Sequence, residues 1–167
     1  MSLDNETGLD PPGIRVRPVF GLVAADSFAP GYFVWAVLIA NLARIGYEEK
    51  NMYIAVYDWR ISFQNTEVRD QTLSRIKSSI ELMVATNGGK KVVVIPYSMG
   101  VLYFLHFMEW VEAPAPMGGG GGSDWCAKHI KAVTNIGGPF LGVSKSVAGL
   151  FSIEARDIVV ASPHSPS

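Results

Sequence analysis

Residues 92–104, VVVIPYSMGVLYF, decide the fold of this chain. The apolar run at 91–95 is typical of a buried strand, and residues 101–111 are apolar nearly all round, which predicts a helix deep in the protein. Only a tight turn fits between them. A strand, a sharp turn carrying Ser98 and a helix form the sequence context of a nucleophile elbow, G-x-S-x-G in its common form, with Pro96 in place of the first glycine.

Such a turn gives a serine the geometry that acyl chemistry needs. It lifts the Ser98 hydroxyl clear of the sheet, and it aims the Met99 amide and the helix N-terminus at the oxyanion that develops during attack. We expect Gly100 to be small because the helix packs close to a neighbouring strand. The alternative is a plain strand–turn–helix in which Ser98 caps the helix.

A serine nucleophile also needs a general base, and none of the three histidines is a credible one. His106 lies along the same predicted helix, about 12 Å from Ser98. His129 precedes a predicted strand and therefore lies at the edge of the sheet opposite Ser98. His164 belongs to a Ser/Pro-rich tail.

The orienting acid is equally hard to find. Asp58 follows a predicted strand at the correct edge of the sheet, but it precedes Ser98 in the chain, whereas α/β-hydrolases order their triad as serine, acid, histidine. We therefore interpret Asp58 as structural, paired with Arg60. Nothing in the sequence places Asp157 near the site. The chain thus offers a nucleophile without a complete triad.

Outside this junction, strands and helices alternate, which predicts an α/β fold with a mostly parallel sheet flanked by helices. Residues 1–13 form a polar lead-in, 113–125 a flexible insert and 161–167 a disordered tail. Gly46 is expected to end one helix. Asn65 or Thr66 is expected to cap the helix that Asn87 ends, and its apolar residues at helical spacing are Leu73, Ile76, Ile80 and Met83. The predicted strands are 14–20, 52–57, 91–95 and 130–136; the predicted helices are 32–45, 66–86, 101–111 and 147–155; and 21–31 is a predicted loop.

Composition excludes several classes of protein. The formal charge of −1 comes without any charge block, so nucleic-acid binding has no electrostatic footprint. Cys126 is the single cysteine, which excludes an internal disulfide framework and a multi-cysteine metal site. The longest apolar run, 32–40, is too short to span a bilayer, and the N-terminus lacks the pattern of a signal peptide.

Four stretches resemble the lecithin–cholesterol acyltransferase family, and within it the plant phospholipid:diacylglycerol acyltransferases. They are 29–60 (ending in YDWR), 96–100 (PYSMG), 113–122 (APAPMGGGGG) and 135–142 (NIGGPFLG). The resemblance implies an incomplete α/β-hydrolase core over 14–160 that transfers a fatty acyl group from phospholipid to diacylglycerol through a serine ester. Ser98 would be the nucleophile and the Met99 amide an oxyanion donor, with no cofactor or metal. The partners would be the two lipids and a membrane surface, at the endoplasmic reticulum, and no nucleic acid.

The chain departs from the family at several points. The family usually has histidine where this chain has Tyr97. Its acid and histidine lie beyond the GGPFLG segment, and its membrane anchor and oxyanion loop lie upstream of the residues present here. We therefore expect a central fragment that is inactive alone.

Two other functions stay open. The chain could derive from a lipase or phospholipase that uses water as the acceptor, or it could be a non-catalytic lipid-binding module. The aromatic side chains could line an acyl groove, meet a membrane surface or belong to an ordinary core; they are Phe28, Tyr32, Phe33, Trp35, Phe140 and Phe151.

Overall fold

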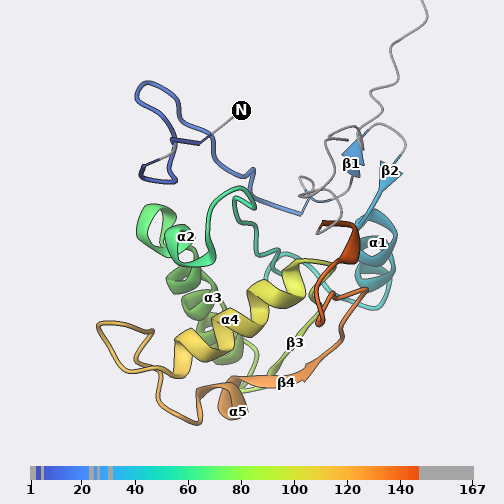
Figure 1. Cartoon of the computed structure of the whole chain (residues 1–167). Coiled ribbons are helices and arrows are strands. Elements are labelled where there is room, and N and C mark those ends of the chain that lie inside the picture. The colour runs from blue at the N-terminus through green and yellow to red at the C-terminus, as the bar shows by residue number, and fades with distance from the viewer. Residues whose placement is uncertain (1–2, 5, 23–24, 26, 30–31, 147–167) are drawn as a thin grey trace, which may run out of the picture.

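The computed structural model describes residues 3–4, 6–22, 25, 27–29 and 32–146, and these form helices around a small parallel sheet (Figure 1). The elements in chain order are β1 (Ser27–Ala29), β2 (Tyr32–Phe33), α1 (Ala36–Arg44), α2 (Phe63–Asp70), α3 (Thr72–Thr86), β3 (Val92–Val94), α4 (Gly100–Glu112), α5 (Trp125–His129) and β4 (Ile130–Val133). The predicted helix at 147–155 and the tail at 161–167 lie outside the described residues.

The core lies between α3 and α4, which run side by side in Figure 1. In α3, Leu73, Ile76 and Ile80 recur at helical spacing and are buried, as the sequence predicted. The buried residues of the core cluster are Leu73, Ile76, Ile80, Tyr103, Phe104, Phe107, Val111 and Trp125. Helix α4 buries one face and not its whole surface, because Leu105 and Glu109 are exposed.

Strands β3 and β4 pair in parallel, which confirms the predicted relation between the 91–95 and 130–136 runs. Val92 lies opposite Ile130, and Val94 lies opposite Val133. Val92 and Val94 pack on the helical core, whereas Val93, on the other face, is 53% exposed. The sheet is therefore covered on one face by the described residues. A separate antiparallel pair, β1 and β2, lies apart from it.

Two predicted strands are wrong. Residues 14–20 and 52–57 belong to no helix or strand and have no ladder partner among the described residues. At 14–20 the polar backbone and side chains turn to an acidic residue instead: the Val16 amide and the Arg17 guanidinium both donate to Asp10. At 52–57 Tyr57 packs against the core and stacks on Tyr103 at a centroid distance of 4.0 Å, whereas Tyr53 is exposed.

The helix predicted over 66–86 is two helices, because Gln71 adopts a left-handed conformation with φ +54° between α2 and α3. Ser62, and not Asn65 or Thr66, caps α2: its hydroxyl accepts the Asn65 amide at 3.2 Å. The Glu67 carboxylate spans the break by accepting the Ser74 amide at 3.0 Å. Asn87 ends α3, as predicted.

The helix predicted from Tyr32 begins four residues later, at Ala36, because Tyr32 and Phe33 form β2. Part of the predicted loop at 21–31 is likewise a strand, β1. Gly46 follows α1 with φ +98° and donates its amide to the Ala43 carbonyl at 3.1 Å, which is the predicted C-terminal stop.

The glycine-rich segment 118–122 folds back against the C-terminal end of α4. The Gly119 amide donates to the Trp110 carbonyl at 2.7 Å, and the Gly121 amide donates to the Val111 carbonyl at 2.8 Å. A Cβ on Gly119 would lie 2.7 Å from the Trp110 ring, and one on Gly121 would lie 2.6 Å from the Trp125 ring. Only glycine fits these close approaches to the two indoles.

Candidate active site

The turn at 96–100 joins the carboxyl end of β3 to α4 and is held on the neighbouring chain by two backbone hydrogen bonds. The Ser98 amide donates to the Ile136 carbonyl at 2.8 Å, and the Ile136 amide donates to the Pro96 carbonyl at 3.0 Å. Tyr97 and Ile136 form an isolated parallel bridge at the same place. The turn is therefore fixed by main-chain contacts on both sides of Ser98.

Ser98 has φ +50°, and with Gln71 it is one of two non-glycine residues with positive φ in the described part of the chain. L-residues rarely adopt this conformation because Cβ crowds the backbone. The side chain is exposed, and its hydroxyl has no hydrogen-bond partner among the described residues. The N-cap of α4 is Met99 and not Ser98, and no side chain caps this helix. The structure thus does not support the alternative of Ser98 as a helix cap.

The Met99 amide lies at the N-terminus of α4. Gly100 donates its amide to the Tyr97 carbonyl at 2.8 Å, and Val101 donates to the Ser98 carbonyl at 3.1 Å, whereas the Met99 amide donates to no acceptor in the described part of the chain. A free amide at the positive end of a thirteen-residue helix, next to the serine, can donate to an anionic oxygen.

The expected reason for a small residue at Gly100 is wrong. A Cβ built on Gly100 meets no described atom within 4 Å. The tight glycine of the site is Gly138, where a Cβ would lie 2.6 Å from Val101 Cγ2 and 2.5 Å from Asn135 Oδ1. Gly138 therefore lets the chain after β4 pack on the first turn of α4. Its position in the GGPFLG segment does not predict this role.

Tyr97 contacts the residue that precedes α1. Its ring meets Trp35 edge to face, with centroids 5.8 Å apart and planes at 74°. Tyr97 remains partly exposed, and Trp35 is half-buried. The residue that departs from the family pattern thus joins the elbow to the N-terminus of α1 through an aromatic pair.

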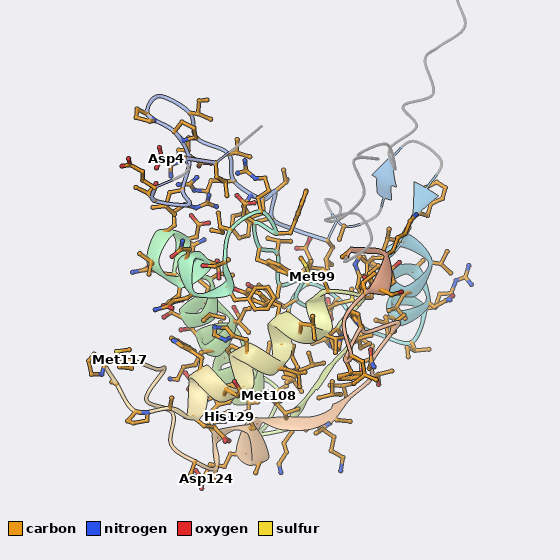
Figure 2. The ribbon with its side chains drawn as sticks, in the orientation of Figure 1. Asp4, Met99, Met108, Met117, Asp124 and His129 are labelled. Carbon is orange, nitrogen blue, oxygen red and sulfur yellow. The ribbon has the colours of Figure 1, made fainter. Side chains whose placement is uncertain are left out.

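No described histidine lies where a base for Ser98 is needed. His106 sits two turns into α4 against Phe63, and its Nε2 is buried without a hydrogen-bond partner among the described residues. His129 ends α5, with Nδ1 2.8 Å from the Trp125 carbonyl. Figure 2 shows His129 near the end of α4 that lies far from Met99, which agrees with its predicted place at the other edge of the sheet. His164 lies outside the described residues.

Asp58 belongs to a cluster of three carboxylates and three guanidinium groups, here called the acid–arginine cluster. Asp58 accepts two hydrogen bonds from the Arg60 guanidinium, at 2.9 and 2.6 Å, and one from the Arg60 amide at 3.1 Å, which confirms the predicted pair. It accepts a further bond from Arg69 at 3.0 Å. The members of the cluster are Asp10, Arg17, Asp58, Arg60, Arg69 and Asp70. Asp58 is therefore committed to structural contacts. Asp157 lies outside the described residues.

The cluster also sets the charge state of Asp58. Hydrogen bonds from Arg60, opposed by burial and aided by Arg69, lower the pKa of the Asp58 carboxyl to about 2. The pKa of Arg69 is raised: burial opposes this shift, and the Asp70 and Asp58 carboxylates produce it. Every member of the cluster lies within ion-pair distance of at least two groups of opposite charge. The cluster joins the lead-in, through Asp10, to the YDWR motif and to α2.

The aromatic residues that could have formed an acyl groove do not gather at one site among the described residues. Phe33 and Phe140 are largely exposed, and Phe151 and the side chains of Phe28 and Tyr32 are outside the described residues. A surface cavity of about 470 Å³ lies elsewhere, and Ser98 is not among its lining residues: Phe20, Tyr53, Gln71, Ser74, Arg75, Ser78 and Ser79.

The described residues include neither a metal-binding cluster nor a membrane-spanning helix. They contain no cluster of three or more histidine, cysteine, aspartate or glutamate side chains arranged to hold a metal ion. Within the same residues, every helix falls short of the length and apolar character needed to cross a bilayer.

Comparison with known proteins bears out the predicted resemblance. The sequence model of the family described as Lecithin:cholesterol acyltransferase matches residues 1–166. The chain is 82% identical over 166 residues to Phospholipid:diacylglycerol acyltransferase 1 of Arabidopsis thaliana, covering 99% of this chain and 25% of the relative. It is 69% identical to Putative phospholipid:diacylglycerol acyltransferase 2 of the same plant, with the same coverage.

A fungal relative is more distant. The chain is 46% identical to the Phospholipid:diacylglycerol acyltransferase of Schizosaccharomyces pombe, covering 94% of this chain and 24% of the relative. The chain thus spans about a quarter of the length of the curated relatives that it matches.

Proposed function

The chain belongs to the lecithin:cholesterol acyltransferase family, and from this premise we propose that Ser98 carries a fatty acyl group from a phospholipid to diacylglycerol. The observation that carries the proposal is the conformation of Ser98, at φ +50° on an exposed strand-to-helix turn, with a hydroxyl that has no partner among the residues the structure describes. The two plant relatives support the substrates, since both are named for phospholipid and diacylglycerol.

The proposed reaction has two acyl transfers. The Ser98 oxygen attacks the ester carbonyl carbon of the phospholipid, its proton passes to a base, and the carbonyl oxygen becomes an oxyanion that the Met99 amide stabilises. When that intermediate collapses, the ester bond breaks and lysophospholipid leaves with the proton. The diacylglycerol hydroxyl then attacks the acyl-serine, which yields triacylglycerol and restores the serine hydroxyl.

The base and the orienting acid belong to parts of the protein other than the described residues. His106 lies about two helical turns from Ser98 along α4, and Figure 2 shows His129 near the end of α4 far from Met99. Asp58 is hydrogen-bonded to Arg60 and Arg69. We propose that residues 14–160 supply part of an α/β-hydrolase core, including the nucleophile and one oxyanion donor. The same proposal sets the reaction at a membrane surface, that of the endoplasmic reticulum, with no cofactor, metal or nucleic acid as a partner.

The test is a chimera in which this chain replaces the matching segment of the Arabidopsis thaliana relative that is 82% identical to it. With labelled phospholipid and diacylglycerol, we expect labelled triacylglycerol. Ser98→Ala should lower the rate by on the order of 10⁴-fold or more, and should abolish labelling by a fluorophosphonate. Ser78→Ala, which removes another exposed serine, should leave both unchanged. Acyl transfer that survives in Ser98→Ala would refute the assignment.

Hydrolysis is the second candidate, and the exposure of Ser98 to water favours it. Water attacking the acyl-serine would release free fatty acid in place of triacylglycerol. Product analysis of the same chimera separates the two functions. Triacylglycerol as the main labelled product supports transfer, because a transferase must keep water from its acyl-enzyme; free fatty acid as the main product supports a lipase.

A further inference from the structure

A turn close to Ser98 carries two apolar side chains outward. The Gly142 amide donates to the Pro139 carbonyl at 2.9 Å and closes a four-residue turn with Phe140 and Leu141 at its centre. Phe140 is 56% exposed, and Leu141 is fully exposed, so the leucine contacts almost nothing in the described protein. Residues 139–142 are called the apolar turn below.

The stem of the apolar turn is fixed to the elbow. Ile136 accepts the Ser98 amide at 2.8 Å, and Gly138 lies so close to Val101 that a Cβ would come within 2.6 Å of its methyl group. The Gly138 amide also donates to Asn135 Oδ1 at 2.9 Å. Phe140 and Leu141 therefore lie two to three residues from a stem that the backbone of the nucleophile itself holds in place.

The charge of this region fits a surface of phosphate headgroups. From Thr134 to Ser146 the chain has no carboxylate, and its single charged residue is Lys145. A carboxylate here would be repelled by an anionic surface and would lose its water on entering it. Transfer of two adjacent apolar side chains from water into a lipid phase, by contrast, is favourable.

We infer that the apolar turn enters a lipid surface beside Ser98, with Phe140 and Leu141 among the acyl chains. The inference deepens the proposed function and rests on it for the identity of the lipids, because it brings the nucleophile to the surface that holds both substrates. The partner is thus a phospholipid bilayer and not a second copy of the chain.

The test measures binding of the full 167-residue chain to phosphatidylcholine vesicles by flotation. We expect Leu141→Ser to weaken partitioning by about tenfold, as loss of one buried leucine side chain predicts. Leu141→Phe should retain binding, because it keeps the apolar character. The matched control is Met117→Ser: Met117 is 82% exposed, and Figure 2 shows it beyond the end of α4 that lies far from Met99.

Three results would overturn the inference: equal binding by Leu141→Ser and the unchanged chain, equal losses in Leu141→Ser and Met117→Ser, or a loss of self-association in Leu141→Ser with vesicle binding unchanged. Ser98→Ala separates this inference from the proposed reaction, since it should bind vesicles as the unchanged chain does. If the chimera fails to transfer acyl groups while the chain still binds vesicles, the proposed reaction is refuted and the lipid contact of the apolar turn is not.

Discussion

The elbow and the acid–arginine cluster differ in whether their polar groups have hydrogen-bond or ion-pair partners. In the cluster, three carboxylates are matched by three guanidinium groups, and Arg69 alone contacts Asp10, Asp58 and Asp70. At the elbow, the backbone is equally well held, but the Ser98 hydroxyl and the Met99 amide have no partner among the described residues. The paired groups of the cluster stabilise the structure, whereas the groups at the elbow are available to bind a reactant.

The two regions should therefore respond differently to substitution. Removing a cluster member leaves its buried partners with fewer counterions, which is costly. The Ser98 hydroxyl has no hydrogen-bond partner among the described residues. We therefore expect its removal to lower the rate of acyl transfer without lowering the free energy of unfolding. The following substitutions test this contrast on the free energy of unfolding.

Arg69→Met should have the largest effect. Arg69 is 7% exposed, and its loss leaves Asp58 and Asp70 short of a donor. We expect a loss of about 3–5 kcal/mol in the free energy of unfolding, measured by urea denaturation. The control, Lys128→Met, breaks the exposed pair with Asp124 and should cost less than about 1 kcal/mol. Equal costs for the two would show that the cluster behaves as a surface pair.

Gly138→Ala should come next. The new methyl group would meet Val101 and the Asn135 side chain at less than 3 Å, so the chain after β4 must move away from α4. We expect a loss of about 1–3 kcal/mol, together with slower fluorophosphonate labelling of Ser98 in the chimera. Gly100→Ala, where a Cβ meets nothing within 4 Å, is the matched control. A neutral Gly138→Ala would mean that this packing does not hold the elbow.

Lowering the pH should reduce the contribution of the acid–arginine cluster to the free energy of unfolding. The pKa of Asp58 is lowered from an ordinary 3.8 to about 2, so its contribution to stability is present above about pH 4. That contribution, about 2 kcal/mol, should be lost as the pH falls from 4 to 2. Asp10, whose pKa is also lowered, acts in the same direction. Asp58→Asn should reduce this pH dependence; an unchanged acid profile would contradict the pairing.

Ser98→Gly should have the smallest effect, and its sign is opposite. Glycine adopts φ +50° without the Cβ penalty, so the variant should gain about 0.5–1 kcal/mol in unfolding free energy while losing labelling. Ser98→Ala keeps the penalty and should show no gain. Thermal denaturation of the two variants measures the difference. If Ser98→Gly is no more stable than Ser98→Ala, the turn stores no strain.

The sequence predicted the elbow well because its signals are local. The β-branched run, the Pro96 turn and the apolar helix follow one another directly over residues 91–111, and the structure has β3, the turn and α4 in that order. The parallel pairing with β4 also followed from the pattern. The buried stripe of α3 followed from helical spacing, although the break at Gln71 did not, since no residue there marks a left-handed conformation.

The failures involve partners that a local pattern cannot supply. The runs at 52–57 and 91–95 are both apolar, but only the second has a neighbouring strand among the described residues. A ladder needs two strands, so apolar character alone predicts burial and not pairing. The role of Gly138 was missed for a related reason, because close approach to Val101 depends on residues far apart in the chain.

The close fit of glycines 119 and 121 against Trp110 and Trp125 has a consequence for how this segment can vary. A run of identical small residues looks tolerant of insertions and deletions, as spacers usually are. Here Gly119 packs on the Trp110 ring and Gly121 on the Trp125 ring. Adding or deleting a glycine would therefore displace both residues from the rings they contact. Variation between related sequences should accordingly concentrate at the exposed tip, 114–117, and leave the glycine count unchanged.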